Sequence, residues 1–457
     1  GKGFAFLGVK PLLIGEVTMV LGMLVLVRSR CAVAMLASLP AVCIFAFFSM
    51  ILTRVLMDMG SNGLEAIRDG VIGIYALFTF IVIALLLEKP SRLGVVLRLY
   101  GAFAVVYGFV GILVPHITIH LYPYIPLVPG TTTHMVSVRL GEAATHIGGI
   151  AVFALLGLRK FSLFWVCCVA VGMLALAPSR AALLCAVMAV VAAAFLGNKI
   201  MRFVPIVASI MVAFTVAYVL DLNFEIENGR MVGPQQIVDN VESIFGRSKA
   251  TNLDGTKEWR LSWWRAIVDY TFDGPYFWTG KGFGMSLAET DGFVVGLESG
   301  GPVLRSPHNI HMSYLGRTGV PGLVMWGVLV VAWYLTILLT IMRAKARGDR
   351  EWAYVMIWAA CYVGAIIVNS TFDVAIEGPM QGIVFWVMMG LGLATAMLYR
   401  IEVMEAGQRP ARSPFDPEID FKRPPEEPAS FKASAPTRGG NPANRNTTHL
   451  PQTEGAG

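Results

Sequence analysis

Apolar residues along this chain gather in long runs that short polar segments separate. The runs are roughly 17 to 23 residues long, which is the length a helix needs to cross the hydrocarbon core of a bilayer. This pattern predicts an all-α fold, a polytopic bundle of transmembrane helices. We predict about eleven spans, the fifth starting nearer Val136: 11–27, 31–53, 70–87, 93–113, 145–157, 161–177, 180–197, 203–220, 320–342, 352–369 and 379–399.

Composition supports the membrane assignment and excludes other classes. The chain has 457 residues, of which 56% are hydrophobic and 14% are charged, whereas about 25% are charged in an ordinary globular domain. No polar segment combines a basic face with interleaved aromatic residues, so we expect no nucleic-acid partner. All six cysteines fall inside apolar runs, where cysteine usually behaves as a small hydrophobic residue.

Basic residues divide the loops into two sets and predict the topology. Apart from the long segment 221–308, one set of alternate loops holds twelve Lys and Arg residues, and the other holds four. The positive-inside rule places the richer set in the cytoplasm. Residue 1 then lies outside, the tail lies inside, and we expect a twelfth span upstream of Gly1.

Two domains follow from this topology. Residues 1–404 form the predicted transmembrane domain, which includes a large outer loop over 221–308. Residues 405–457 hold nine of the 24 prolines and few large apolar side chains. Such a segment cannot bury a core, so we predict a disordered cytoplasmic tail.

The outer loop is long enough to be functional, and we predict helices in it near Pro234–Phe245 and Thr256–Tyr270. The second helix has a stripe of large side chains that suits the water–lipid interface. Arg260 lies beside this stripe. It either snorkels from an interfacial anchoring helix or points into a cavity and holds an anion. The stripe consists of Trp259, Trp263, Ile267 and Tyr270.

Two further arginines lie at the outer ends of predicted spans. Arg180 begins a span, and a charge at the hydrocarbon edge is costly without a partner. Arg139 is a weaker candidate of the same kind, and either side chain could instead snorkel to lipid headgroups. The glycine-rich stretch Gly280–Gly284 predicts a turn rather than a phosphate-binding loop, because neither Ser nor Thr follows Lys281.

Histidine is the side chain best suited to exchange a proton near neutral pH. His308 lies where the outer loop enters a hydrophobic span, and His311 follows on the same side of a helix. A packing role is the alternative for both. His116 and His120 have a metal-chelating spacing, but no further ligands are evident. Asp373 and Glu377, in the outer segment 370–378, could orient an imidazole or bind a sugar, and the sequence leaves open whether they reach one.

Three motifs in order make the chain similar to a known superfamily. His308-Asn309 is followed by nine residues, Gly319, two residues and Gly322; Ser179 precedes Arg180; and Arg260, three residues and Trp264 precede the glycine-rich turn. Together these motifs resemble the O-antigen ligase and O-antigen polymerase superfamily of bacterial envelope glycan enzymes. The resemblance covers about residues 10 to 400.

The resemblance implies an inverting glycosyltransferase of lipopolysaccharide biosynthesis that needs neither a metal nor a cofactor. Its donor would be a glycan on undecaprenyl diphosphate, and its acceptor a lipid A–core sugar at the periplasmic face of a Gram-negative inner membrane. His308 would be the general base, and Arg180 and Arg260 would bind the diphosphate. Possible supporting residues are Arg265, Arg139, Asn309, His311 and Asp373.

Other functions remain open at this point. A polymerase that joins lipid-linked repeat units shares the donor and differs only in the acceptor. A protein O-oligosaccharyltransferase would be expected to have an additional acceptor-binding domain. A transporter should have broken helices at the membrane midplane and detectable halves, whereas the polar residues here gather at the outer edge.

Overall fold

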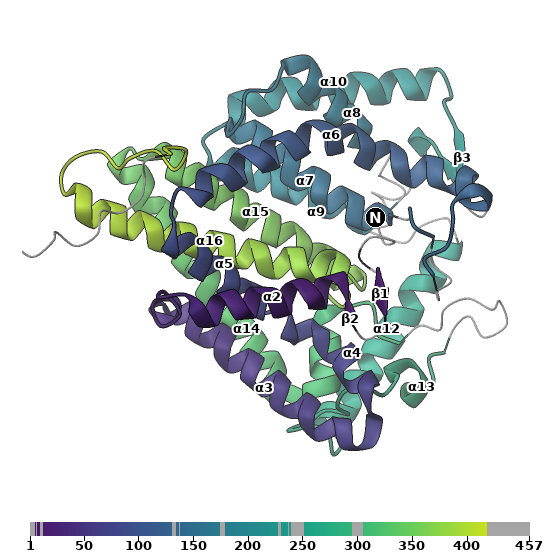
Figure 1. Cartoon of the computed structure of the whole chain (residues 1–457). Helices are drawn as coiled ribbons and strands as arrows, with labels where there is room; N and C mark the ends of the chain where they lie inside the picture. The colour runs from purple at the N-terminus through teal and green to yellow at the C-terminus, as the bar shows by residue number, and fades with distance from the viewer. Residues whose placement is uncertain are drawn as a thin grey trace, which may run out of the picture. The chain divides into compact units, whose positions relative to one another are not determined.

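The computed structural model describes residues 5, 7–9, 12–129, 134–136, 138–173, 179–226, 230–235, 237–238, 251–294 and 305–417. The chain divides into units 1–420 and 421–457, and all described residues belong to the first. The predicted all-α class is confirmed (Figure 1). The main helices are α2 (Ile14–Arg28), α3 (Leu39–Asn62), α4 (Leu64–Ile74), α5 (Leu77–Glu88), α6 (Arg92–Leu121), α7 (Leu140–Leu156), α8 (Leu163–Gly172), α9 (Arg180–Leu196), α10 (Ile200–Val219), α12 (Thr251–Phe272), α13 (Leu287–Asp291), α14 (Ile310–Arg347), α15 (Arg350–Phe372) and α16 (Pro379–Ala406).

Short elements complete the described chain. The antiparallel pairs β1 (Gly8–Val9) with β2 (Leu12–Leu13) and β3 (Phe224–Ile226) with β4 (Arg230–Val232) are each two-stranded. Two 3-10 turns, η1 (Ala34–Leu36) and η2 (Tyr122–Tyr124), lie before α3 and after α6. The pair β1–β2 precedes α2, the other short elements lie between helices, and none of them changes the helical architecture.

Six described helices are long and apolar enough to cross a membrane, and the bent pair α4 and α5 would make a seventh. Each of the eleven predicted spans overlaps a helix, but α2, α7, α8 and α9 have only 10 to 17 residues. The count of eleven therefore exceeds the number of full-length helices. Two starts also differ: α3 begins at Leu39, where Pro40 occupies the first turn, and α14 begins ten residues before its predicted span.

The core of the bundle lies around α15 and α16. In their most apolar windows, 72% and 78% of residues are buried, against 6% in α10. Helices α7, α9 and α14 pack on α15, and α5 packs on α16. Figure 1 traces α15 and α16 between these helices and α10 along the edge of the bundle. This arrangement brings the starts of α7, α9 and α14 to the end of α15.

Helix α14 breaks at Gly319, and the glycine-rich turn fills the break. Gly319 has φ 69° and ψ −167°, a backbone conformation that is essentially restricted to glycine. The Lys281 N–H donates to the Gly316 carbonyl oxygen at 2.7 Å, and the Val320 N–H donates to the Phe277 carbonyl oxygen at 2.8 Å. The predicted turn is therefore confirmed, and it replaces hydrogen bonds that the broken helix cannot make.

The stripe on α12 packs on protein, which corrects the predicted interfacial anchor. Trp263 and Ile267 are fully buried against Leu287 of α13 and Leu315 of α14. The Trp263 indole N–H donates to Asp291 Oδ2 at 2.7 Å. A tryptophan with a buried ring and a satisfied N–H is a packing residue, so the stripe fixes α12 over the start of α14.

The predicted boundary at residue 405 is also too early. Helix α16 continues to Ala406, and residues 407–417 fold back onto the bundle. The Trp352 indole N–H donates to the Arg412 carbonyl oxygen, and the Arg412 guanidinium pairs with Glu402 at 2.7 Å. Composition alone does not reveal such anchors. Disorder after residue 417 stays a prediction that lies outside the described residues, as does most of the helix near Pro234–Phe245.

Candidate functional site

His308 has an unusual backbone conformation at the start of α14. Its φ is 53°, in the left-handed region that few residues other than glycine adopt. Asn309 then caps the helix, and its Oδ1 accepts from the N–H groups of His311 at 2.9 Å and Met312 at 3.2 Å. Asn309 therefore has a structural role, and it fixes the turn at which the His308 side chain leaves the backbone.

Helix α12 supports the same turn from the other side. The Trp264 indole N–H donates to the Pro307 carbonyl oxygen at 2.8 Å. This bond holds the peptide unit that directly precedes His308. Arg260 and Trp264 are four residues apart, so the tryptophan that holds Pro307 and the cation of Arg260 lie on the same face of α12.

Asp373, the C-cap residue of α15, orients the imidazole. Its Oδ1 lies 3.3 Å from His308 Nδ1 and 3.5 Å from an Arg139 nitrogen, and the Val374 N–H donates to it at 2.8 Å. Burial would raise the pKa of Asp373, but the hydrogen bonds and the nearby positive charge of Arg139 together lower it below its usual value. An ionised carboxylate only accepts, so His308 Nδ1 donates, and in the neutral imidazole Nε2 is then the acceptor.

Two more arginines lie beside this pair. The Arg260 guanidinium donates to the Phe372 carbonyl oxygen at 2.8 Å, and its buried Nε has no hydrogen-bond partner among the described residues. Burial lowers the pKa of Arg260, the Asp373 carboxylate raises it, and the nearby Arg180 charge lowers it again. Arg180 is the first residue of α9, after the capping residue Ser179. Arg260 therefore lies close to Asp373, and Arg180 lies close enough to Arg260 to lower its pKa.

Glu377 is a second carboxylate at the site. The Ser313 hydroxyl of α14 donates to Glu377 Oε1 at 2.6 Å. Burial raises the pKa of Glu377 above its usual value, although its hydrogen bonds and nearby positive charges act against that rise. The question that the sequence left open is answered: Asp373 contacts His308, and Glu377 contacts the first turns of α14.

Two of the possible supporting residues lie elsewhere. Arg265 is exposed on α12. His311 bridges α14 and α15: its Nδ1 accepts from the Trp326 indole N–H at 3.1 Å, and its Nε2 lies 3.4 Å from the Thr371 hydroxyl. Both ring nitrogens are thus used in packing, so His311 supports the helix positions rather than the imidazole of His308.

Sequence reasoning missed a buried ion pair beneath the site. Arg317 in α14 is 4% exposed and lies 3.1 Å from Asp69 of α4. Asp69 also pairs with Arg305 at 3.2 Å and accepts the Gly284 N–H at 3.1 Å. A buried charge requires a partner. Arg317 inside an apolar run was the available signal, but the sequence does not indicate which acid pairs with it.

The glycine-rich turn has no anion-binding role within this network. Lys281 pairs with Asp291 and lies 4.2 Å from the Tyr270 ring centroid. Gly280, Gly282 and Gly284 all have positive φ. The turn connects α12, α13 and the break in α14, and thereby fixes the scaffold below His308.

Comparison with known families identifies the region that contains most of this geometry. The O-antigen ligase family matches residues 163–327. This region is similar to the O-antigen ligase family. The match confirms the resemblance, and it spans Arg180, Arg260 and His308, whereas Arg139 and Asp373 lie outside it. No curated protein matches the chain significantly.

The family and the helices together support a coarse functional statement. The protein is a multi-pass membrane protein with an O-antigen ligase region, which supports a glycosyltransferase-like ligase or polymerase that uses lipid-linked glycans. The O-antigen ligase region contains His308, Arg180 and Arg260; the end of α15 supplies Asp373, which contacts His308, and the start of α7 supplies Arg139, which contacts Asp373.

Proposed function

We propose that this protein transfers a glycan from undecaprenyl diphosphate to an acceptor sugar at the periplasmic face of the inner membrane, most directly O-antigen to a lipid A–core sugar. The observation that carries the proposal is the hydrogen bond between His308 and Asp373 beside the guanidinium of Arg260. An oriented base next to anion-binding donors is what an acceptor hydroxyl and a diphosphate leaving group require.

The proposed reaction is a single displacement. The acceptor hydroxyl loses its proton to His308 Nε2 as its oxygen attacks the anomeric carbon of the donor sugar. The bond between that carbon and the diphosphate oxygen breaks, and undecaprenyl diphosphate leaves with the electron pair. One displacement inverts the anomeric configuration.

Each charged residue has a distinct role in this step. Arg180 and Arg260 would bind the negative charge that the diphosphate gains, because guanidinium stays protonated and can form paired hydrogen bonds. Asp373 would hold the Nδ1–H and stabilise the imidazolium after proton transfer. Arg139 would keep Asp373 ionised, so that the carboxylate does not take up the acceptor proton itself.

An O-antigen or exopolysaccharide polymerase is the alternative. The donor chemistry and these residues would be the same, but the acceptor would be a second lipid-linked repeat unit. The match of residues 163–327 suits both activities. The identity of the acceptor therefore distinguishes the ligase from the polymerase.

Reconstitution of the full chain with both acceptors tests the proposal. Purified protein in liposomes receives a glycan on undecaprenyl diphosphate, together with lipid A–core and a second lipid-linked repeat unit. We expect glycan on lipid A–core with inverted linkage, and the same yield after a chelator. Elongated carrier-linked chains would establish the polymerase instead. If neither product forms and the reconstituted protein has the same unfolding temperature as before reconstitution, the enzymatic assignment is overturned.

A further inference from the structure

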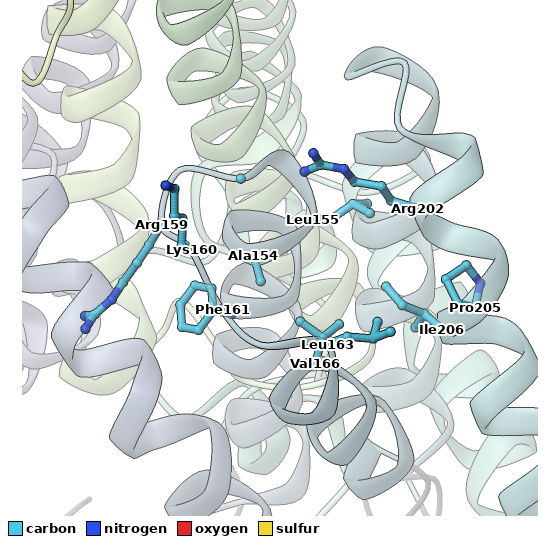
Figure 2. A pocket seen from close by; sticks show the side chains of 11 residues that line it. Ala154, Leu155, Arg159, Lys160, Phe161, Leu163, Val166, Arg202, Pro205 and Ile206 are labelled. Atoms are coloured by element: carbon cyan, nitrogen blue, oxygen red, sulfur yellow. The ribbon is translucent and has the colours of Figure 1, made fainter.

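A second cationic site lies at the opposite end of α7 from Arg139. Helix α7 has 17 residues, so its ends are roughly 25 Å apart. Beyond Leu156, a cavity of about 600 Å³ opens among the end of α7, the start of α8 and the start of α10. Figure 2 shows this site, which we call the α7–α10 pocket. Its charged lining residues are Arg159, Lys160 and Arg202.

The cations and the apolar side chains occupy different parts of the α7–α10 pocket. In Figure 2, Arg202 and Lys160 lie on the loop side, while Phe161, Leu163 and Ile206 lie deeper along the helices. A Cβ atom on Gly157 would lie 3.2 Å from an Arg202 guanidinium nitrogen, so the guanidinium covers the α7 C-cap. The pocket is therefore cationic at one end and apolar at the other.

Among the described residues, no carboxylate pairs with the cations of the pocket. Within the part of the chain that the structure describes, no ion pair includes Arg159, Lys160 or Arg202. Arg159 extends toward α6, with its guanidinium carbon 5.8 Å from the Phe161 ring centroid. Arg202 and Lys160 are thus the two cations best placed for an anion in the pocket.

Helix α10, which lines one side of the pocket, has an apolar and exposed surface along its length. No residue of α10 is buried, and Met201, Val204 and Val212 are each more than half exposed. On the other side, Phe161 stacks on Trp165 of α8 with ring centroids 4.3 Å apart. An apolar face of this length requires hydrocarbon rather than water. A soluble anion would satisfy the cations but not this wall.

We propose that the α7–α10 pocket binds an anionic glycerophospholipid. The headgroup phosphate lies between Arg202 and Lys160, and the acyl chains extend along α8 and α10. Charge complementarity favours an anionic headgroup over a zwitterionic one. The site is separate from His308, so the inference does not depend on the proposed glycan transfer.

Native mass spectrometry of the full chain tests the proposal with phosphatidylglycerol as the probe. Protein is released from zwitterionic nanodiscs that contain a small fraction of phosphatidylglycerol, and the retained lipid is counted. We expect one phosphatidylglycerol to remain on wild type. Its apparent affinity should fall by about tenfold in Lys160→Gln and in Arg202→Gln, since each loses a charge-assisted phosphate contact.

Arg343→Gln is the matched control, because Arg343 is an exposed cation near the end of α14 and outside the pocket. It should retain phosphatidylglycerol as wild type does. If a glutamine variant fails to fold, Ala154→Phe tests the same site by filling the pocket while it keeps all three cations, and it too should lose the lipid. Equal retention by the pocket variants and Arg343→Gln would overturn the proposal.

Two competition arms distinguish other sources of the same phosphate chemistry. Displacement of phosphatidylglycerol by an equimolar amount of undecaprenyl phosphate would show that the pocket prefers the polyprenyl carrier, which overturns the phospholipid assignment. Displacement by millimolar inorganic phosphate would show that the acyl chains contribute nothing. We expect neither competitor to displace the lipid.

Discussion

The two ends of α7 both gather arginine side chains, yet their charge balance differs. At the start of the helix, Arg139 pairs with Asp373, which also bonds to His308. At its end, Arg159, Lys160 and Arg202 form no ion pair with a carboxylate of the described residues. One end therefore combines both signs of charge with a titratable ring, and the other end is only cationic.

This difference separates two tasks that arginine clusters perform. A carboxylate that orients an imidazole prepares the imidazole to take up a proton. The same carboxylate then stabilises the positive charge of the imidazolium. Unbalanced cations beside an apolar wall can only attract an anion with a hydrocarbon chain. Counting arginines in the loops would treat the ends alike, whereas the position of one aspartate distinguishes them.

Removing the imidazole should have the largest effect at the carboxylate end. In His308→Ala, we expect the rate of glycan transfer to fall by roughly 10²- to 10⁴-fold, the usual contribution of a general base. The rate is measured in liposomes with saturating donor. His134→Ala, in the segment between α6 and α7, is the control and should stay within about threefold of wild type. Comparable activity of His308→Ala and wild type would remove the base from the mechanism.

The sequence predicted the membrane-helix class and the place of His308, because both depend on local patterns. Hydrophobic run length indicates helices, and the change from polar to apolar residues after His308 indicates the start of one, whereas the break at Gly319 was not predicted. The sequence offered Asp373 only as one of two acids that could orient an imidazole, and it left open whether either reaches His308. Asp373 follows α15, 65 residues later in the chain, and only the packing of α14 on α15 brings the two side chains together.

Contacts between residues that are distant in sequence also explain where the sequence predictions were wrong. The α12 stripe has the periodicity of an interfacial helix, but Trp263 packs on α13 and α14. Short helices such as α8 are as apolar as full spans, so run length overestimates complete crossings. Residues 407–417 are polar and proline-rich, yet Trp352 and Glu402 anchor them. In each case the deciding contact is distant in sequence.

Removing the negative charge at Asp373 makes the two ends of α7 more alike. Asp373→Asn should lower the transfer rate by roughly 10- to 100-fold, the usual value of a hydrogen bond to a charged group. Substrate KM should change little, because Asp373 acts through His308. Asp269→Asn, an exposed position on α12, is the control. A variant that loses only donor affinity would assign Asp373 to substrate binding instead.

Changing the geometry of one cation while keeping its charge should have a smaller effect. In Arg260→Lys, we expect a loss of about threefold to tenfold in kcat/KM for the donor, because lysine cannot form the paired contacts of guanidinium. Arg265→Lys lies on the same helix at an exposed position, and it should lose less. Equal losses in the two variants would mean that α12 contributes only general positive charge.

The protonation of Glu377 decides whether the carboxylate end holds one negative charge or two. Burial raises the pKa of Glu377, so its contribution to stability is fully present below the usual glutamate pKa of about 4.3. That contribution is lost as pH rises through the raised value. Glutamine mimics the neutral acid and keeps an oxygen for the Ser313 hydroxyl. Glu377→Gln should therefore match wild type near pH 4.5 and unfold at a higher temperature at pH 8, by roughly 2–4 °C for each kcal/mol. If the unfolding temperatures of Glu377→Gln and wild type differ by the same amount at pH 4.5 and at pH 8, Glu377 is ionised throughout this range. The site would then balance its arginines with two carboxylates.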